Sequence, residues 1–156
     1  MNFFKKLRVF KPVKVEMLVY YFPLIELNNT GLTVDGASLV KSGKEYRIEN
    51  KGQLIHRSRI FFKSHFLTSF HFPQPFVVIG DCLTNPDYRG MGIYPKAIRY
   101  IASEYIQEKQ VFILVSKDNF ASIRGIEKAG FNFFVRLKGF RFLGLYFKKQ
   151  IFCSKN

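Results

Sequence analysis

Two short, strongly apolar runs separated by one helical stretch constrain the fold of this 156-residue chain more than any other feature. The first run is PFVVIGDCLT at residues 75–84, and the second is QVFILVS at residues 110–116. Both have the length and composition of buried strands. Between them, apolar residues recur at helical spacing from Ile98 to Tyr105, and Pro95 suits a first helical turn. A strand–helix–strand unit of this kind predicts that the two strands lie parallel in one sheet.

Further strands are predicted on both sides of this unit. Residues 14–24 are an apolar and aromatic run that stops near Pro23. Residues 45–62 are typical of a hairpin, because a Lys-Gly turn separates two alternating runs. Residues 131–149 indicate two more strands, with a break near Gly139.

A second helix is predicted over residues 119–131, with Asn119 as its N-cap and Gly130 just past its end. Residues 28–44 are rich in turn formers and indicate no definite element. No linker or repeat divides the chain, so residues 1–156 are predicted to form one domain. The fold class is α/β in the broad (α+β) sense, with a mixed sheet and a helical crossover.

The composition favours a globular protein that meets anionic partners. Hydrophobic residues make up 47% of the chain, and the formal net charge is +14. Cys82 and Cys153 are too few for a disulfide framework, which favours a reducing compartment. The first 14 residues scatter lysines among apolar residues, unlike a signal peptide, and no run is long enough to span a bilayer. We therefore expect a cytoplasmic protein.

Arg89, Gly90 and Gly92 precede the crossover helix in the stretch NPDYRGMGIYP. A helix start presents unpaired N–H groups, glycines allow close approach to the backbone, and an arginine adds charge. This combination predicts a phosphate-binding loop. It is not a P-loop, because no Gly-Lys-Ser/Thr follows, and it lacks the third glycine of a dinucleotide fingerprint.

The stretch PDYRGMGI resembles the acetyl-CoA pyrophosphate loop of the GNAT superfamily of N-acyltransferases, whose pattern is Arg/Gln-x-x-Gly-x-Gly/Ala. Its six positions are filled in order by Arg89, Gly90, Met91, Gly92, Ile93 and Tyr94. The downstream stretch NFASIRGIEKAGF resembles the second signature of the superfamily, with Asn119, Ser122, Gly130 and Phe131 at the matching positions. The resemblance extends from about Phe76 to Leu137.

The resemblance implies a mostly antiparallel sheet in which the parallel pair splays apart at a bulge, with acetyl-CoA in the gap as co-substrate and no metal. The backbone N–H groups of residues 89–94 would hold its pyrophosphate. A backbone N–H near Leu83 or Thr84 would stabilise the oxyanion. Asn119 would contact the pantetheine arm, and Ser122 would also belong to the cofactor-binding site. A neutral amine would attack directly, through a tetrahedral intermediate.

Two positions depart from the family pattern. Tyr94 stands where glycine or alanine is usual, and the resulting RGxGIYP is similar to a branch of sugar-modifying and surface-polysaccharide acetyltransferases. Ile126 stands where many members have the tyrosine that protonates the leaving thiolate. Because a CoA thiol has a pKa of about 8.5, the thiolate can leave without much help.

The general base is open at the level of sequence, because the glutamate that members often carry on the strand before the loop is missing. Asp81 is a candidate, with an ion pair to a neighbouring basic residue as the alternative. His56 is a second candidate, with a hydrogen-bonded core histidine as the alternative. Cys82 is interpreted as a structural thiol, and His65 and His71 as non-catalytic.

The sequence thus predicts an N-acetyltransferase that acts on a primary amine, with an amino sugar of a polysaccharide pathway as the suggested acceptor. A catalytically inactive CoA-binding relic and a basic nucleic-acid-binding module are the alternatives. The family usually has two helices within residues 24–45, where this chain shows only a weak helical pattern. The acceptor side is therefore expected to be short, or to be completed by a second subunit of a homodimer.

Overall fold

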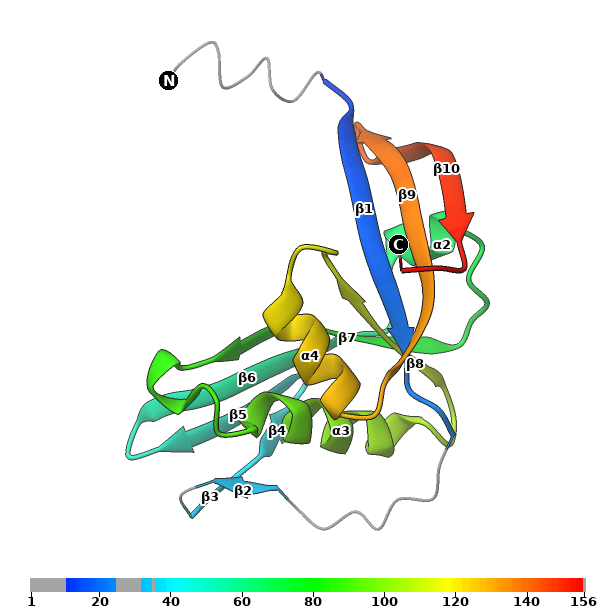
Figure 1. Cartoon of the computed structure of the whole chain (residues 1–156). Coiled ribbons are helices and arrows are strands. Elements are labelled where there is room, and N and C mark those ends of the chain that lie inside the picture. Colours follow the sequence, from blue (N-terminus) through cyan, green and yellow to red (C-terminus); the bar gives the residue numbers. More distant parts are fainter. Residues whose placement is uncertain (1–10, 25–31, 35, 156) are drawn as a thin grey trace.

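The structure, a computed structural model, describes residues 11–24, 32–34 and 36–155 and contains an eight-stranded mixed sheet with helices on its faces (Figure 1). The order of strands across this sheet is β10-β9-β1-β8-β7-β6-β5-β4, and β2 and β3 form a separate pair. The strands are β1 (Val13–Tyr21), β2 (Thr33–Val34), β3 (Ala37–Ser38), β4 (Val40–Ser42), β5 (Glu45–Asn50), β6 (Gln53–Phe61), β7 (Phe76–Thr84), β8 (Gln110–Val115), β9 (Asn132–Phe142) and β10 (Leu145–Phe152). The helices are α2 (His65–Ser69), the 3-10 turn η2 (Pro86–Tyr88), α3 (Ile93–Tyr105) and α4 (Phe120–Lys128).

The predicted parallel pair is confirmed. Strands β7 and β8 run parallel, with Phe76 opposite Gln110 and Ile79 opposite Ile113, and α3 makes the crossover. The predicted apolar stripe of α3 is buried, because Ile98, Ile101 and Ala102 have no exposed surface. These side chains pack on the same core cluster as β7 and β8. Every other pairing of the eight-stranded sheet is antiparallel, as the family resemblance implies.

Strand β7 carries a bulge, and it separates from its parallel neighbour β8 just before this bulge. Its ladder with β8 ends at Ile79, although both strands continue. On the other side, the partner of Arg57 is Leu83, whereas the partner of Arg59 is Gly80. One residue of β6 therefore faces two residues of β7, and Asp81 adopts a positive φ of 47°. A bulge of this kind increases local twist and turns the strand away from its neighbour.

The hairpin predicted over residues 45–62 is confirmed as β5 and β6. The break predicted near Gly139 is wrong. Gly139 lies inside β9 opposite Val15, and the chain turns instead at Leu143-Gly144. A side chain at Gly139 would meet the Phe147 carbonyl oxygen at 3.3 Å, so this glycine serves close packing between strands.

The structure defines two further segments. Within residues 24–45, the described part forms the short strands β2, β3 and β4 and contains no helix. Residues 25–31 and 35 of that segment lie outside the described residues, as do residues 1–10 of the stretch compared with a signal peptide. The Phe-rich segment after β6 contains the short helix α2, which Ser64 caps by accepting a hydrogen bond from the Leu67 N–H.

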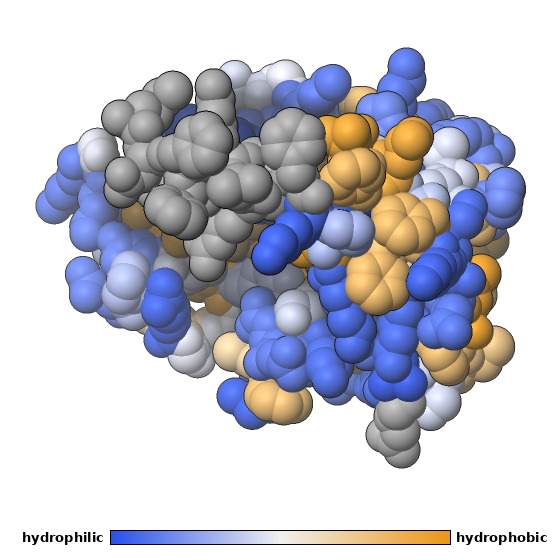
Figure 2. All heavy atoms as spheres, turned by 90° about the horizontal axis from the view of Figure 1, so that it is seen from above, coloured by the Kyte–Doolittle hydropathy of each residue, from blue (hydrophilic) through white to orange (hydrophobic). Residues whose placement is uncertain are grey.

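Seen from the end where β1 and β10 start, the surface is mainly hydrophilic with a local group of apolar atoms (Figure 2). The strand ends and the turn in this region supply exposed apolar side chains, among them Val13, Leu143 and Leu145. This end lies away from α3 and α4, which cover the other part of the sheet (Figure 1).

Candidate active site

A cavity of about 690 Å³ lies where β7 leaves β8, between the loop after β7, the start of α3 and helix α4. Nine of the ten residues predicted to bind the cofactor line this one cavity: Leu83, Thr84, Arg89, Gly90, Gly92, Ile93, Tyr94, Asn119 and Ser122. The tenth, Met91, is 56% exposed and lines a smaller adjoining cavity instead. The fold therefore brings together two motifs that lie far apart in the sequence.

The glycine loop offers bare backbone to this cavity. Gly90 and Gly92 have φ values of 81° and 74°, in the left-handed region that favours glycine. An added Cβ at either position would meet no atom within 4 Å, so the space above this backbone is open. No side chain caps the start of α3 at Gly92, and Pro95 has no N–H. The arrangement suits an anion that accepts hydrogen bonds from the N–H groups of Ile93 and Tyr94.

The charge of the cavity wall suits the same kind of ligand. Its charged side chains in the described part of the chain are Arg89, Arg124 and Lys128, and no carboxylate is among them. Arg89 is held in place because its Nε donates a hydrogen bond to the Thr84 carbonyl oxygen at 3.2 Å. A diphosphate group would therefore meet both backbone donors and fixed positive charge.

Helix α4 forms the opposite wall, and its predicted ends are confirmed. The Asn119 side-chain oxygen accepts a hydrogen bond from the Ser122 N–H at 3.1 Å, as an N-cap does. Gly130 follows the last helical residues with a φ of 94°. Because its oxygen caps the helix, Asn119 has its side-chain amide N–H groups left for a ligand.

His56 lies behind the cavity wall and does not line it. Its side chain is fully buried. Its Nδ1 is 2.9 Å from Thr84 Oγ1, and its Nε2 is 2.8 Å from Ser58 Oγ. Burial lowers the pKa of His56 to about 4, so the ring is neutral at physiological pH. This is the environment of a hydrogen-bonded core histidine, which was one of the two alternatives left open by the sequence. His56 contacts the cavity wall through Thr84.

Cys82 continues this network at the bulge. Ser58 Oγ donates a hydrogen bond to Cys82 Sγ at 3.2 Å, and Cys82 lines the cavity. Burial raises the pKa of the Cys82 thiol to about 11, which keeps it protonated and a poor nucleophile. The bulge is thus held by a chain of hydrogen bonds from Thr84 through His56 and Ser58 to Cys82.

Asp81 faces away from the cavity. Its two carboxylate oxygens lie 3.1 Å from Arg57 Nη2 and 2.9 Å from Arg59 Nη1. The residue does not line the cavity, and 41% of its side chain is exposed. Asp81 therefore forms ion pairs with basic neighbours, which was one of the two alternatives left open by the sequence.

The contact between Tyr94 and Gly125 was missed by sequence reasoning. Gly125 lies inside α4, and a Cβ there would be 2.5 Å from Tyr94 Cδ1. The glycine therefore makes room for the tyrosine ring, and both residues line the cavity. The one available signal was a glycine in the middle of a helix, which usually has a packing reason. Ile126, at the position of the family tyrosine, is fully buried in the core.

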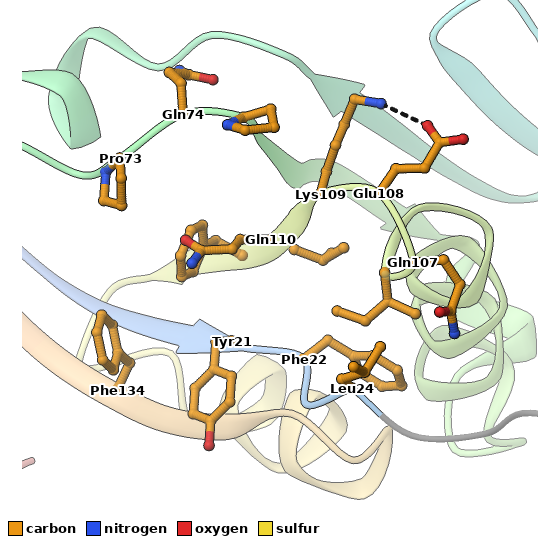
Figure 3. Close-up of a pocket in the computed structure, with 14 residues that line it drawn as sticks. Tyr21, Phe22, Leu24, Pro73, Gln74, Gln107, Glu108, Lys109, Gln110 and Phe134 are labelled. Atoms are coloured by element: carbon orange, nitrogen blue, oxygen red, sulfur yellow. Dashed lines mark hydrogen bonds and ion pairs between the residues drawn. The ribbon is translucent and has the colours of Figure 1, made fainter.

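A second cavity, of about 490 Å³, lies at the opposite end of the parallel pair (Figure 3). Its wall is mostly apolar, and the labelled side chains include Tyr21, Phe22, Leu24 and Phe134. None of the predicted cofactor-binding residues lines it. It therefore does not share the chemistry of the glycine-loop cavity.

The described residues offer neither a metal-binding cluster nor a membrane-spanning helix. They contain no group of three or more His, Cys, Asp or Glu side chains placed to hold a metal ion. No helix among them combines the length and apolarity needed to cross a membrane.

By its fold, the protein belongs to the class of α/β proteins. Its mixed sheet has one parallel pair, and the crossover helix between these two strands starts at a glycine loop. A model of the family described as "Acetyltransferase (GNAT) family" matches residues 51–131, more than half of the chain. The chain therefore belongs to the GNAT acetyltransferase family, whose members use acetyl-CoA as co-substrate.

Solved structures agree with this assignment at the level of the fold. An acetyltransferase from the GNAT family of Colwellia psychrerythraea matches with a TM-score of 0.60 and 15% identity, over 87% of this chain and 59% of that one. A protein of the GNAT family from Novosphingobium aromaticivorans matches with a TM-score of 0.59 and 15% identity, over 82% of this chain and 64% of that one. The chain thus spans less than two thirds of the length of either neighbour. Comparison with curated proteins gives no significant match.

Proposed function

We propose that the protein is an acetyl-CoA-dependent N-acetyltransferase that transfers an acetyl group to a primary amine. The observation that carries this proposal is the open glycine loop. Backbone N–H groups at Ile93 and Tyr94, unoccupied space above Gly90 and Gly92, and three cations without a carboxylate all border one cavity. A ligand with a diphosphate next to an extended arm fits such a cavity.

The chain's own residues divide into two groups in this proposal. The loop from Arg89 to Tyr94 would hold the diphosphate, and Asn119 with Ser122 would contact the pantetheine arm. The N–H groups near Leu83 and Thr84, just past the bulge, would stabilise the negative charge that develops on the carbonyl oxygen during attack. The bulge supports this role because it releases backbone groups of β7 from the ladder with β8.

The amine must reach the carbonyl without its extra proton. The described residues that line the cavity include neither a carboxylate nor a histidine. We therefore infer that the proton leaves to water or to a group supplied with the acceptor. His56 and Asp81 are not in direct contact with the cavity, and a role for either in the chemistry stays a prediction.

An amino sugar of a surface-polysaccharide pathway is the acceptor that we propose. Its support is the similarity of the stretch RGMGIYP to sugar-modifying acetyltransferases. The unpaired thiols of Cys82 and Cys153 favour a reducing, cytoplasmic location for this reaction. A homodimer that completes the acceptor side is part of the same proposal.

One other function has a specific observation in its favour. Ile126 is sealed in the core, His56 lies behind the wall, and Asp81 is paired with arginines. A CoA-binding protein without catalytic activity would look the same. Turnover of acetyl-CoA with a panel of amino sugars and other primary amines separates the two, because binding without turnover on every amine would favour the inactive protein.

Substitution of Gly92 by valine tests the proposed cofactor site. We expect Gly92→Val to weaken CoA binding by at least about a hundredfold, because a branched side chain fills the open space and disfavours the left-handed backbone. Titration calorimetry with CoA measures this effect. Gly144→Val is the matched control, because Gly144 also has a positive φ and open space but lies in the β9–β10 turn. Gly144→Val should be destabilised about as much as Gly92→Val but should keep wild-type affinity for CoA. Wild-type affinity for CoA in Gly92→Val would contradict the proposal.

A further inference from the structure

The phenol of Tyr94 has no assigned role in the proposed reaction. Tyr94 lies in the first turn of α3 and lines the cavity together with Cys82 and Thr84. No hydrogen-bond partner of its hydroxyl is found among the described residues. Among the described residues, this hydroxyl is not one of the fully buried polar atoms that lack a partner, so it keeps some exposed surface. A hydroxyl in this position can still gain a hydrogen bond from a ligand.

The ring is held so that its hydroxyl has little freedom. The Cδ1–Cε1 side of the ring lies against Gly125, where a Cβ would be 2.5 Å from Cδ1 and 2.7 Å from Cε1. The ring centroid is also 6.3 Å from that of His56, the core histidine behind the wall. Its neighbours therefore fix the orientation of the phenol before any ligand arrives.

The side chain reaches from the glycine loop back to the bulge of β7. Tyr94 is near enough to Cys82 that a negative charge on that sulfur would raise the pKa of the phenol. The N–H groups proposed to stabilise the oxyanion follow Cys82 directly, at Leu83 and Thr84. The hydroxyl of Thr84 is already engaged with His56. Tyr94 therefore places a phenol close to Cys82, at the end of the cavity where the thioester would lie.

Building on the proposed function, we propose that the Tyr94 hydroxyl donates a hydrogen bond to the sulfur of bound CoA and stabilises the thiolate as it departs. The amine nitrogen forms a bond to the carbonyl carbon, and the C–S bond breaks with its electron pair on sulfur. Water takes the proton lost by the amine and supplies the proton that converts the thiolate to CoA thiol. Tyr94 begins and ends the step protonated.

The balance of acidities favours donation over proton transfer. Burial raises the pKa of Tyr94 well above its usual value, and the neighbouring Cys82 raises it further. A CoA thiol titrates near a pKa of about 8.5, so a proton would move uphill from this phenol to the thiolate. A neutral donor can nevertheless stabilise the thiolate, because hydrogen bonds to charged groups are stronger than those between neutral groups. Tyr94 would thus act as a neutral hydrogen-bond donor on α3, whereas the family tyrosine at the position of Ile126 would act as an acid on α4.

Binding of CoA and desulfo-CoA at two pH values tests this role without any turnover. Desulfo-CoA lacks the sulfur but keeps the diphosphate and the pantetheine arm. In the wild type, the preference for CoA over desulfo-CoA should grow by about tenfold or more between about pH 7 and about pH 9.5, as the thiolate forms. Tyr94→Phe keeps the ring and should lose most of this growth. Tyr100→Phe makes the same change on α3 outside the cavity and should behave as the wild type.

The outcomes separate this inference from the proposed function. Absence of binding for both ligands in the wild type would overturn the proposed cofactor site itself. Binding of both ligands with a preference that does not change with pH would overturn only the role of Tyr94. Full wild-type growth of the preference in Tyr94→Phe would likewise overturn that role and leave the cofactor site standing.

Discussion

His56 joins two strands at the point where the ladder between them is irregular. Its ring nitrogens contact Thr84 on β7, just past the bulge, and Ser58 on β6, opposite the bulge. Because the bulge leaves two residues opposite one, backbone bonds alone hold this region less firmly. A fully buried neutral imidazole with both nitrogens engaged replaces part of what the ladder loses. His56 therefore helps to shape the part of the cavity wall that Thr84 and Cys82 form.

Stability at low pH tests the neutral state of His56. The pKa is about 4 in the folded protein against 6.5 for an ordinary histidine, so the unfolded chain takes up the proton first as pH falls. The wild type should lose up to about 3 kcal/mol of unfolding free energy from this residue between about pH 7 and pH 4. His56→Gln should be less stable at pH 7 but should show a flatter decline with falling pH. Urea unfolding across this range measures both curves, and parallel curves would show that the pKa of His56 is the same in the folded and the unfolded protein.

Helix α4 contains a residue that its own helical propensity disfavours. Gly125 lies in its interior, where glycine costs about 1 kcal/mol relative to alanine. The contact with Tyr94 explains this choice, since the ring occupies the volume of the missing side chain. Residue 94 is small in the family pattern but a tyrosine here, so the glycine and the tyrosine compensate for each other.

The effect of Gly125→Ala should reverse with the residue at position 94. In the wild type the alanine should lower the unfolding free energy by about 1–3 kcal/mol, because its Cβ overlaps the ring. In a Tyr94→Ala background the same substitution should raise it by up to about 1 kcal/mol, because only helical propensity remains. Denaturant unfolding of the four proteins completes the cycle. An effect of one sign in both backgrounds would mean that Tyr94 does not press on Gly125.

The elements that sequence predicts well are those whose signals are local. The glycine loop, the Asn119 cap and the stripe on α3 each depend on residues within a few positions, and all three were found in place. The break expected at Gly139 failed because a glycine can serve either a turn or a close contact between strands, and only the partner strand decides which. The Tyr94–Gly125 contact joins two motifs through the folded structure, so neither motif alone indicates it.

The charge of the whole molecule extends the charge of its cavity. The chain carries 25 Lys and Arg against 11 Asp and Glu, and the cavity wall has cations only among its described charged residues. A highly charged anion such as CoA therefore approaches a surface of opposite sign. The long-range part of this attraction is screened by salt, whereas the backbone contacts of the loop are not.

Affinity for CoA should consequently fall with ionic strength. We expect a loss of roughly tenfold between about 0.05 M and about 0.5 M salt, because screening shortens the range of the attraction. Lys128→Gln should weaken binding at low salt and reduce this dependence, because Lys128 lines the cavity. Lys148→Gln on β10 removes the same charge at a distance and should change both quantities less. Equal effects of the two substitutions in calorimetry would show that only net charge matters.

The position of β1 in the sheet has a consequence for how the chain acquires its structure. β1 lies between β8 and β9, with Leu18 opposite Val115 and Val13 opposite Arg141. During synthesis this aromatic strand must remain unpaired until β8 and β9 have been made, while the β5–β6 hairpin forms locally. Such high contact order predicts slow folding, and it makes the newly made chain a client for chaperones that bind exposed apolar segments.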